Sequence, residues 1–511
     1  MKKLKLVSLA IAMACATHLL QAVCSSNTNQ HVAFNRMMSR EASIGIDGVY
    51  YNPAGVVFMG EGHHLAINWQ LAYQTRSIEN DYALFTHNVN NSITPRTFKG
   101  EAFAPVIPSF QYAYNKGRLS LQASFALTGG GGKCTFDNGL GSFEKIVAET
   151  AMAACGLART VDNVLGNTLG QPGMQMFTTD QAFGQRGEYS YNSYMHGRQY
   201  YYGLSVGAAY KFSDNFSAFA GVRGVYASTN YYGYVENIKV GNMPLYKVLD
   251  PNKENAANIE LSCDQSGIGF TPIIGVDFKT GKWNFSAKYE FKTRIRLKNK
   301  AVNQAPSISA LPDNLSRQMV GTLTQVFTNK GMTPENAQAV AANTTQAVLT
   351  NDDVVKTMAS LKTEFDAKLE EAIGEYEDGK KIAGDMPAYL ALGVGYSPVD
   401  AVRVNVGFHW FDDKHATSYN NRQEKLKRGT LEYNAGVEVD VNKKITLSTG
   451  WQNTNYGLSD EYMDDKSFVV SSNSVAVGGV YHINKKMDLN VAYFHTFYQH
   501  KKTSEKVQPF C

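Results

Sequence analysis

The chain of 511 residues carries 49 Lys and Arg against 45 Asp and Glu, a formal net charge of +4, and its mean hydropathy is −0.29. So weak a charge excess gives no argument for a nucleic-acid partner. No run of about 18 apolar residues follows the N-terminal segment, which excludes a spanning helix. Six widely spaced cysteines form neither a zinc pattern nor a disulfide framework, so neither a metal nor a cofactor is expected.

A secretory signal is predicted at the N-terminus, over residues 1–23. Lysines near the start precede an apolar run from Leu6 to about Ala16, and small residues around Ala22 suit a cleavage site. Lipidation at Cys24 is the alternative. Export would place the chain in an oxidising compartment, where Cys134 and Cys155 of one long loop either pair or stay free.

A rigid turn is predicted within residues 24–62, at Asn52, Pro53, Ala54 and Gly55. Proline fixes its own φ and restricts the residue before it, and the Asn52 side chain can close a turn on its own backbone. Gly55 permits a conformation that other residues avoid. Such a turn suits the anchoring of a plug against the first strand, and an ordinary surface turn is the alternative.

Apolar and polar side chains alternate along most of the remaining chain, which predicts strands. The longest unbroken alternation covers 282–298, where Trp283 and Phe285 begin the apolar side and Lys288 lies on the charged side. A transmembrane strand needs about 9–11 tilted residues, apolar outside and polar inside. We therefore predict an all-β, antiparallel, up-and-down transmembrane barrel over 63–511. Similar alternation is found at 65–73, 119–127, 202–212, 402–410 and 433–441.

Short and long connections also alternate, which is typical of such a barrel, with tight turns on the periplasmic side and long loops outside. We count 13 strands, the last at about 487–498. Residues 507–511 are too few for another strand and contain a proline, which cannot donate to a ladder. The barrel thus either closes with an odd number of strands or lacks its last one.

The longest connection, residues 301–386, is predicted to be partly helical. Thr333 and Pro334 suit a cap and a first helical position, and Asn351 opens a second helix. An amphipathic stripe in that helix either helps to form a binding groove or packs on a neighbouring helix near 143–157.

The segment 31–55 resembles the N-terminal hatch of the FadL/TodX-type outer-membrane channels, which carry long-chain fatty acids and other hydrophobic compounds. In that family an Asn-Pro-Ala element precedes the first strand, and the hatch plugs a 14-stranded barrel. The resemblance implies an outer-membrane protein of a Gram-negative-type cell, with external loops that form a greasy landing groove. The implied hatch residues are Phe34, Arg36, Asn52, Pro53, Ala54 and Gly55.

The family also has a kink in its third strand, through which ligand leaves sideways into the membrane. Here the third strand runs into a series of glycines, and glycine weakens a ladder and marks bulges. A flexible entry to the loop 129–199 is the alternative. The implied lateral opening comprises Leu127, Thr128, Gly129 and Gly130.

Positively charged side chains are predicted to line the lumen, where they suit a carboxylate. Cross-strand pairing with inward acids such as Glu432 and Glu438 is the alternative. The family's headgroup-binding cation has no clear counterpart here, so a fatty-acid specificity is not implied. The candidates are Lys288, Lys292, Arg294, Arg296 and Arg403.

The function predicted from these features is passive uptake of hydrophobic molecules such as long-chain fatty acids or aromatic hydrocarbons. The alternatives are a general diffusion porin for polar solutes and a surface antigen or adhesin. An enzyme is not expected, because no nucleophile lies at a spacing from a histidine that is typical of a catalytic pair. The expected partners are a hydrophobic ligand, outer-membrane lipid and the barrel assembly machinery, with the protein a monomer.

Overall fold

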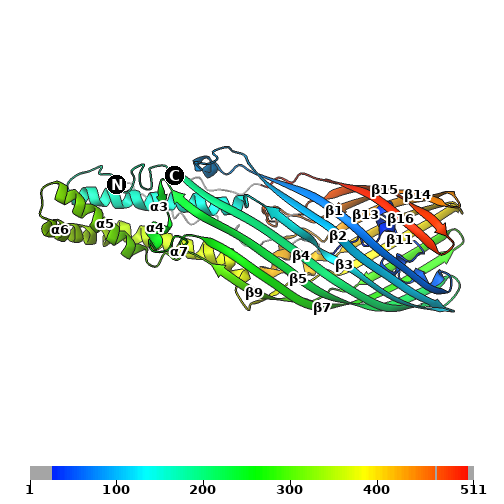
Figure 1. Cartoon of the computed structure of the whole chain (residues 1–511). Helices are drawn as coiled ribbons and strands as arrows, with labels where there is room; N and C mark the ends of the chain where they lie inside the picture. The colour runs from blue at the N-terminus through cyan, green and yellow to red at the C-terminus, as the bar shows by residue number, and fades with distance from the viewer. Residues whose placement is uncertain (1–25, 467–468, 504–511) are drawn as a thin grey trace, which may run out of the picture.

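The computed structural model describes residues 26–466 and 469–503, so the predicted signal at 1–23 and the end of the chain from 504 lie outside the described residues. A barrel occupies one end and a group of helices the other (Figure 1). We call the helical end the outer end and the opposite end, where short turns join the strands, the inner end.

Thirteen strands form one continuous path in which every neighbour is antiparallel and follows in chain order, apart from three short off-path strands. This confirms the predicted up-and-down barrel. The path comprises β1 (Gly62–Asn80), β2 (Arg96–Lys116), β3 (Leu119–Phe136), β4 (Tyr189–Lys211), β5 (Phe216–Val240), β7 (Ile259–Thr280), β8 (Trp283–Glu290), β11 (Tyr389–Val399), β12 (Val402–Phe411), β13 (Leu431–Asn442), β14 (Ile445–Asn455), β15 (Ser472–Asn484) and β16 (Met487–Tyr498). Off the path lie β6 (Met243–Pro244), β9 (Arg296–Gln304) and β10 (Lys381–Ala383).

The two faces of the strands differ as the alternation predicts. On β1, Leu65, Ile67 and Trp69 point outward and are 57%, 78% and 67% exposed, whereas Asn68 and Gln70 on the opposite face are buried inside the barrel. Large apolar side chains exposed at this level, strand after strand, would be unfavourable in water and suit a hydrocarbon surrounding.

The alternation at 282–298 does not form one strand, contrary to the sequence prediction. Ile273 on β7 pairs with Glu290 on β8, and Ser266 on β7 pairs with Lys298 on β9. Between these two pairs β7 covers seven residues, whereas the segment from β8 to β9 covers eight. One extra residue exchanges the two faces of a strand.

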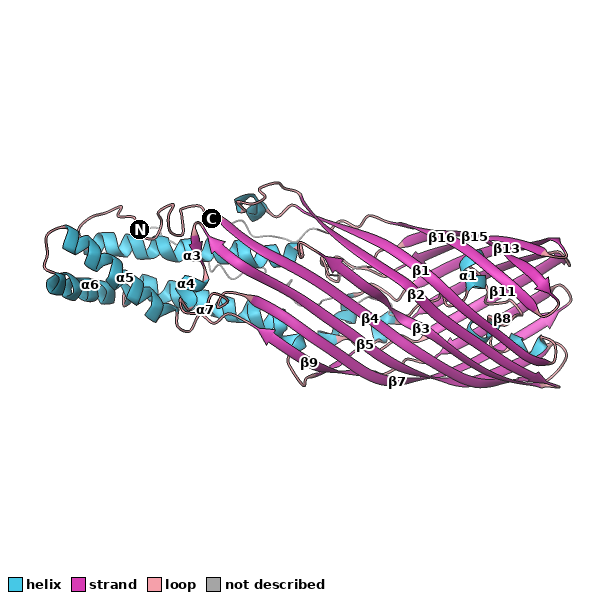
Figure 2. Ribbon diagram, in the orientation of Figure 1, coloured by secondary structure: helices cyan, strands magenta, loops and turns pink. Residues whose placement is uncertain are grey.

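The strands differ greatly in length. β5 has 25 residues and β4 has 23, whereas β11 to β16 have between 10 and 13. At roughly 3.3 Å per residue, β5 spans about 80 Å, far more than one crossing of a bilayer requires. The long strands therefore continue past the barrel and carry the helices (Figure 2).

The helical end is built from the connections 81–95, 137–188, 241–258 and 305–380, which pack on one another around one apolar cluster. As predicted, one helix begins at Pro334 and another just after Asn351, and the latter, α7, packs against α3. No helix in the described ranges is long and apolar enough to cross a membrane. The helices are α3 (Gly141–Thr168), α4 (Tyr246–Leu249), α5 (Leu311–Asn329), α6 (Pro334–Leu349) and α7 (Asp352–Ile373), with short 3-10 turns η2 (Ala83–His87), η3 (Gly374–Tyr376), η4 (Asp413–His415) and η5 (Tyr419–Lys425).

An odd strand number makes the first and last strands, β1 and β16, run in the same direction. Within residues 26–466 and 469–503 no ladder joins these two strands.

Of the two alternatives for Cys134 and Cys155, pairing or free thiols, the structure has the second, because both cysteines are buried and free.

Candidate functional site

Residues 26–61, which we call the hatch, fold into the interior of the barrel. They contain α1 (Val32–Met37), α2 (Gly48–Tyr51) and η1 (Gly55–Phe58). The α1 helix contacts β13 to β16, α2 contacts β2 and β3, and η1 contacts β3, β4 and β7. The rings of Phe34 and Tyr51 are buried and stack at 5.0 Å. The hatch thus reaches strands on several sides of the lumen.

The predicted rigid turn is anchored to three different strands. The side chain of Gln122 on β3 donates to the carbonyl of Pro53 at 2.7 Å, and Ser217 on β5 donates to that of Ala54 at 2.7 Å. Asn52 Nδ2 donates to Asp277 Oδ2 on β7 at 2.6 Å. These bonds tie the turn to the barrel wall near the inner end.

Within the turn, the predicted closure by Asn52 is present, because its Oδ1 accepts the Gly55 N–H at 3.1 Å. The reason for glycine is different from the one expected. Gly55 does not have a positive φ, but a Cβ there would collide with the Asn52 side chain. Close approach, and not an unusual backbone conformation, explains this residue.

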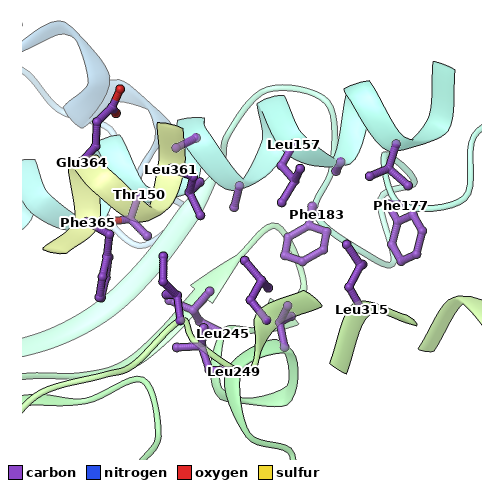
Figure 3. Close-up of a pocket in the computed structure, with 17 residues that line it drawn as sticks. Thr150, Leu157, Phe177, Phe183, Leu245, Leu249, Leu315, Leu361, Glu364 and Phe365 are labelled. Atoms are coloured by element: carbon purple, nitrogen blue, oxygen red, sulfur yellow. The ribbon is translucent and has the colours of Figure 1, made fainter. Parts of the chain in front are cut away.

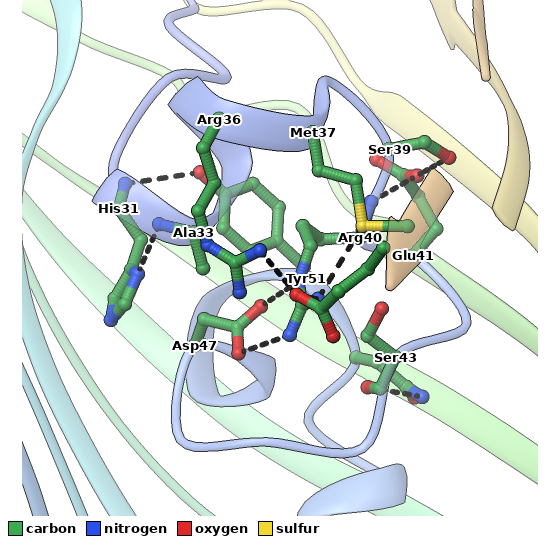
Figure 4. A network of polar contacts seen from close by, with 12 residues as sticks. His31, Ala33, Arg36, Met37, Ser39, Arg40, Glu41, Ser43, Asp47 and Tyr51 are labelled. Carbon is green, nitrogen blue, oxygen red and sulfur yellow. Dashed lines mark hydrogen bonds and ion pairs between the residues drawn. The ribbon is translucent and has the colours of Figure 1, made fainter. Parts of the chain in front are cut away.

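Charged side chains of the hatch are buried in pairs (Figure 4). Arg40 donates two hydrogen bonds to Asp47 at 2.7 and 2.9 Å, and Arg36 forms an ion pair with Glu438 on β13. A charge buried without a partner is very costly, whereas a hydrogen-bonded pair is tolerated. Loss of either partner would weaken the pairing of the other buried charge and would therefore destabilise the hatch in its position inside the barrel.

A histidine of the barrel links the hatch to two strands. His409 on β12 has Glu41 of the hatch 2.7 Å from Nε2 and Glu432 on β13 2.7 Å from Nδ1. The sequence analysis missed this link, and also the bidentate pair of Arg223 with Glu290 at 2.6 and 3.0 Å. Neither contact could be predicted from the spacing of these residues along the chain.

Two of the five predicted lumen cations point inward, and both already have partners. Lys288 donates to the carbonyl of Tyr50 at 2.7 Å and to Glu290 at 2.9 Å. Arg403 pairs with Glu438 at 2.6 Å and also with Asp440. The alternative of pairing with inward acids thus describes Arg403.

The other three predicted cations do not join Lys288 and Arg403 in one site, which corrects the sequence prediction. Lys292 and Arg296 instead both pair with Asp385, at 3.3 and 3.0 Å. Beyond the extra residue that follows β8, Ile295 and Leu297 are buried, whereas Arg294 and Arg296 are exposed. Lys292 donates to the carbonyl of His415 at 2.7 Å. A cluster that presents five cations to one carboxylate therefore does not form.

The wall of the barrel is unpaired between β2 and β3. Their ladder ends at Phe110–Phe125 and resumes at Ala102–Cys134, so residues 103–109 and 126–133 do not pair with each other. This stretch of β2 contains Pro105 and Pro108, which cannot donate to a ladder. On β3 the gap includes all four residues predicted for a lateral opening, Leu127, Thr128, Gly129 and Gly130.

The first described residues of the hatch lie across this gap. The Asn27 N–H donates to the carbonyl of Thr128 at 2.9 Å, and its side chain donates to that of Gly130 at 3.0 Å. Gln30 Nε2 donates to the carbonyl of Leu127 at 2.7 Å. Carbonyls that the strand break leaves without ladder partners are satisfied in this way by the hatch.

An apolar pocket lies among the helices of the outer end (Figure 3). Its walls come from α3, α4, α5, α7 and the loops between them. Phe183, Leu249 and Phe365 are among the side chains that line it, and within the described part of the chain its polar lining residues are Thr150 and Glu364. A pocket of this chemistry suits a small apolar molecule.

A second cavity, which we call the mouth cavity, lies where the loops of the outer end fold over the lumen. Strand residues such as Tyr201 and Tyr231 line it together with loop residues such as Asp413 and Gln423. The sequence analysis did not identify it, because its lining comes from segments that are distant along the chain.

Comparisons with solved structures place the fold. A Pseudomonas aeruginosa FadL homologue superposes with a TM-score of 0.52 at 13% identity, over 96% of this chain and 94% of the other. A deletion mutant of the TodX monoaromatic hydrocarbon channel gives 0.50 at 13% identity, over 93% and 95%. No family model and no curated protein matches the chain. This protein therefore has the fold of the FadL/TodX-type barrels, and the resemblance drawn from residues 31–55 is confirmed at that level.

Proposed function

We propose that this protein is an outer-membrane channel for the passive uptake of hydrophobic molecules. The observation that carries the proposal is the combination of a lumen occupied by a hatch with a wall that is unpaired between β2 and β3. A hatch hinders a continuous water-filled path, whereas a side opening leads toward lipid. A general diffusion porin would need the opposite arrangement.

The proposed route begins in the apolar pocket of the outer end, which would receive the molecule from outside. The molecule then passes the mouth cavity and enters the lumen above the hatch. Residues 103–109 and 126–133 would let it leave sideways once Asn27 and Gln30 release the strand carbonyls. The names of similar proteins, a FadL homologue and a monoaromatic hydrocarbon channel, agree with an apolar cargo.

The domain division belongs to the proposal as well. A signal at 1–23 would be removed, residues 24–62 would form the N-terminal domain that contains the hatch, and 63–511 would form the barrel with its loops. The exposed apolar face would lie in outer-membrane lipid, inserted by the barrel assembly machinery. One copy contains the whole route, so we propose a functional monomer.

Uptake into proteoliposomes tests the function. Vesicles that contain the full chain should take up radiolabelled toluene faster than empty vesicles and should show no matching leak of potassium. Leak of potassium without a gain in toluene uptake would contradict the proposal and favour a polar pore.

The apolar pocket can be tested by two substitutions on the same helix. Phe365→Asp places a charge in the pocket and should reduce toluene uptake several-fold, because an unpaired charge disfavours an apolar occupant. Val355→Asp is the matched control, because Val355 lies on α7 with 46% of its surface exposed. Equal uptake by the two variants would remove the pocket from the route.

A further inference from the structure

The mouth cavity has a chemistry that the apolar pocket lacks. Hydroxyl and amide groups of Tyr231 and Gln423 line it beside the apolar side chains of Leu297 and Leu426. Its charged lining residues are Asp385 and Asp413, both acids. A molecule held here would meet apolar walls together with hydrogen-bond acceptors and a negative charge.

The two acids differ in their partners. Asp385 is well satisfied, because it accepts from the Ile295 N–H at 3.0 Å and pairs with Arg296 at 3.0 Å and Lys292 at 3.3 Å. These two cations offset its charge, so Asp385 contributes little net negative potential to the cavity.

Asp413 has no cation beside it in the described part of the chain. It is 3% exposed, and its Oδ2 accepts the Thr430 N–H at 2.7 Å. Burial raises the pKa of Asp413 to about 7, because the loss of water around its charge outweighs the hydrogen bonds that it accepts from Thr430. The neighbouring Asp412 instead pairs with His415 at 2.6 Å and does not line the cavity.

We propose that the mouth cavity binds the head group of apolar molecules that carry a hydrogen-bond donor, a hydroxyl or an ammonium group, and that it rejects carboxylates. The apolar part would lie against Leu297 and Leu426, and the donor would meet Asp413. A carboxylate would be buried beside Asp413, and cations that contact the lining are already paired with acids, Lys292 and Arg296 with Asp385 and Arg422 with Asp464, which makes its binding unfavourable. The inference rests on the proposed uptake function and narrows its cargo.

Four probes with the same aromatic body test this inference: toluene, benzyl alcohol, benzylamine and benzoate. Equilibrium dialysis of the full chain in detergent micelles at pH 7, corrected for micelles alone, gives the affinity for each. We expect benzyl alcohol and benzylamine to bind at least tenfold more tightly than benzoate. Equal or tighter binding of benzoate would overturn the inference.

Two substitutions separate the role of the cavity from general charge effects. Asp413→Asn keeps an acceptor for the Thr430 N–H and removes the buried acid, so it should reduce the preference of benzylamine over benzoate about tenfold. Asp366→Asn removes the same charge from the exposed face of α7, away from the lining of the mouth cavity, and should leave the preference unchanged. An unchanged preference in Asp413→Asn would also overturn the inference.

Failure of the head-group inference can be distinguished from failure of the proposed function. Uptake of toluene without discrimination among head groups would refute the head-group inference alone. If the vesicles fail to take up toluene and none of the four probes binds, the proposed function fails and the inference fails with it.

Discussion

Asn52→Ala should loosen the hatch while the barrel still assembles. The side chain makes a buried 2.6 Å hydrogen bond to Asp277 and closes its own turn on the Gly55 N–H at 3.1 Å. After substitution, Asp277 keeps only the 2.9 Å bond from Asn284 to the same oxygen. A buried hydrogen bond to a carboxyl group is worth about 2 kcal/mol, which corresponds to about a 30-fold shift toward the undocked hatch.

Hydrogen exchange measures this shift directly. Amides of residues 48–58 should exchange about 30-fold faster in Asn52→Ala, whereas amides of β12 to β16 should remain protected. Asn230→Ala is the matched control, because Asn230 also donates to an aspartate, Asp264 at 2.8 Å, but at an exposed position away from the hatch. If residues 48–58 exchange at the same rate in both variants, the turn does not anchor the hatch.

Two further predictions concern the side opening and the response to pH. Gly131→Phe should reduce toluene uptake several-fold without loss of assembly, because a Cβ at Gly131 meets nothing within 4 Å and the ring would occupy the gap between β2 and β3. Gly156→Phe is the control, because Gly156 is equally unobstructed but lies on α3, and this variant should take up toluene normally. Burial lowers the pKa of His31 to about 4, so the neutral ring stabilises the hatch above pH 6.5 and this contribution is lost as the pH falls toward 4. Protonation of Nδ1 also removes the acceptor for the Ala33 N–H at 2.9 Å, so exchange of residues 31–38 should rise on acidification more in the native chain than in His31→Asn; parallel pH profiles would contradict this.

The alternation of side chains predicted the barrel because the same two-residue period holds along each strand, as in Leu65, Ile67 and Trp69. It failed where a single residue was added. Arg294 and Arg296 continue the pattern of Lys288 in the sequence, yet the extra residue before β9 moves them to the outside. The position of an extra residue depends on how strand segments pair with each other, and the sequence of one strand does not contain that information.

The rigid turn of the hatch could be predicted from local chemistry, because proline and asparagine act on their own backbone. Its partners Gln122, Ser217 and Asp277 could not, because they come from three strands far along the chain. The side opening had a second signal that went unused. Pro105 and Pro108 stand in β2 opposite the glycines of β3, and two prolines in a strand indicate a break in its ladder.

The central claim is that the hatch closes the barrel to water and ions while hydrophobic molecules still pass. Its most direct test is conductance across a planar lipid bilayer, for the full chain and for a chain that lacks residues 26–59. The account predicts no steady current from the full chain and a large, stable current after the deletion, because the hatch contacts strands on several sides of the lumen. A steady current of the same size from both chains would contradict it.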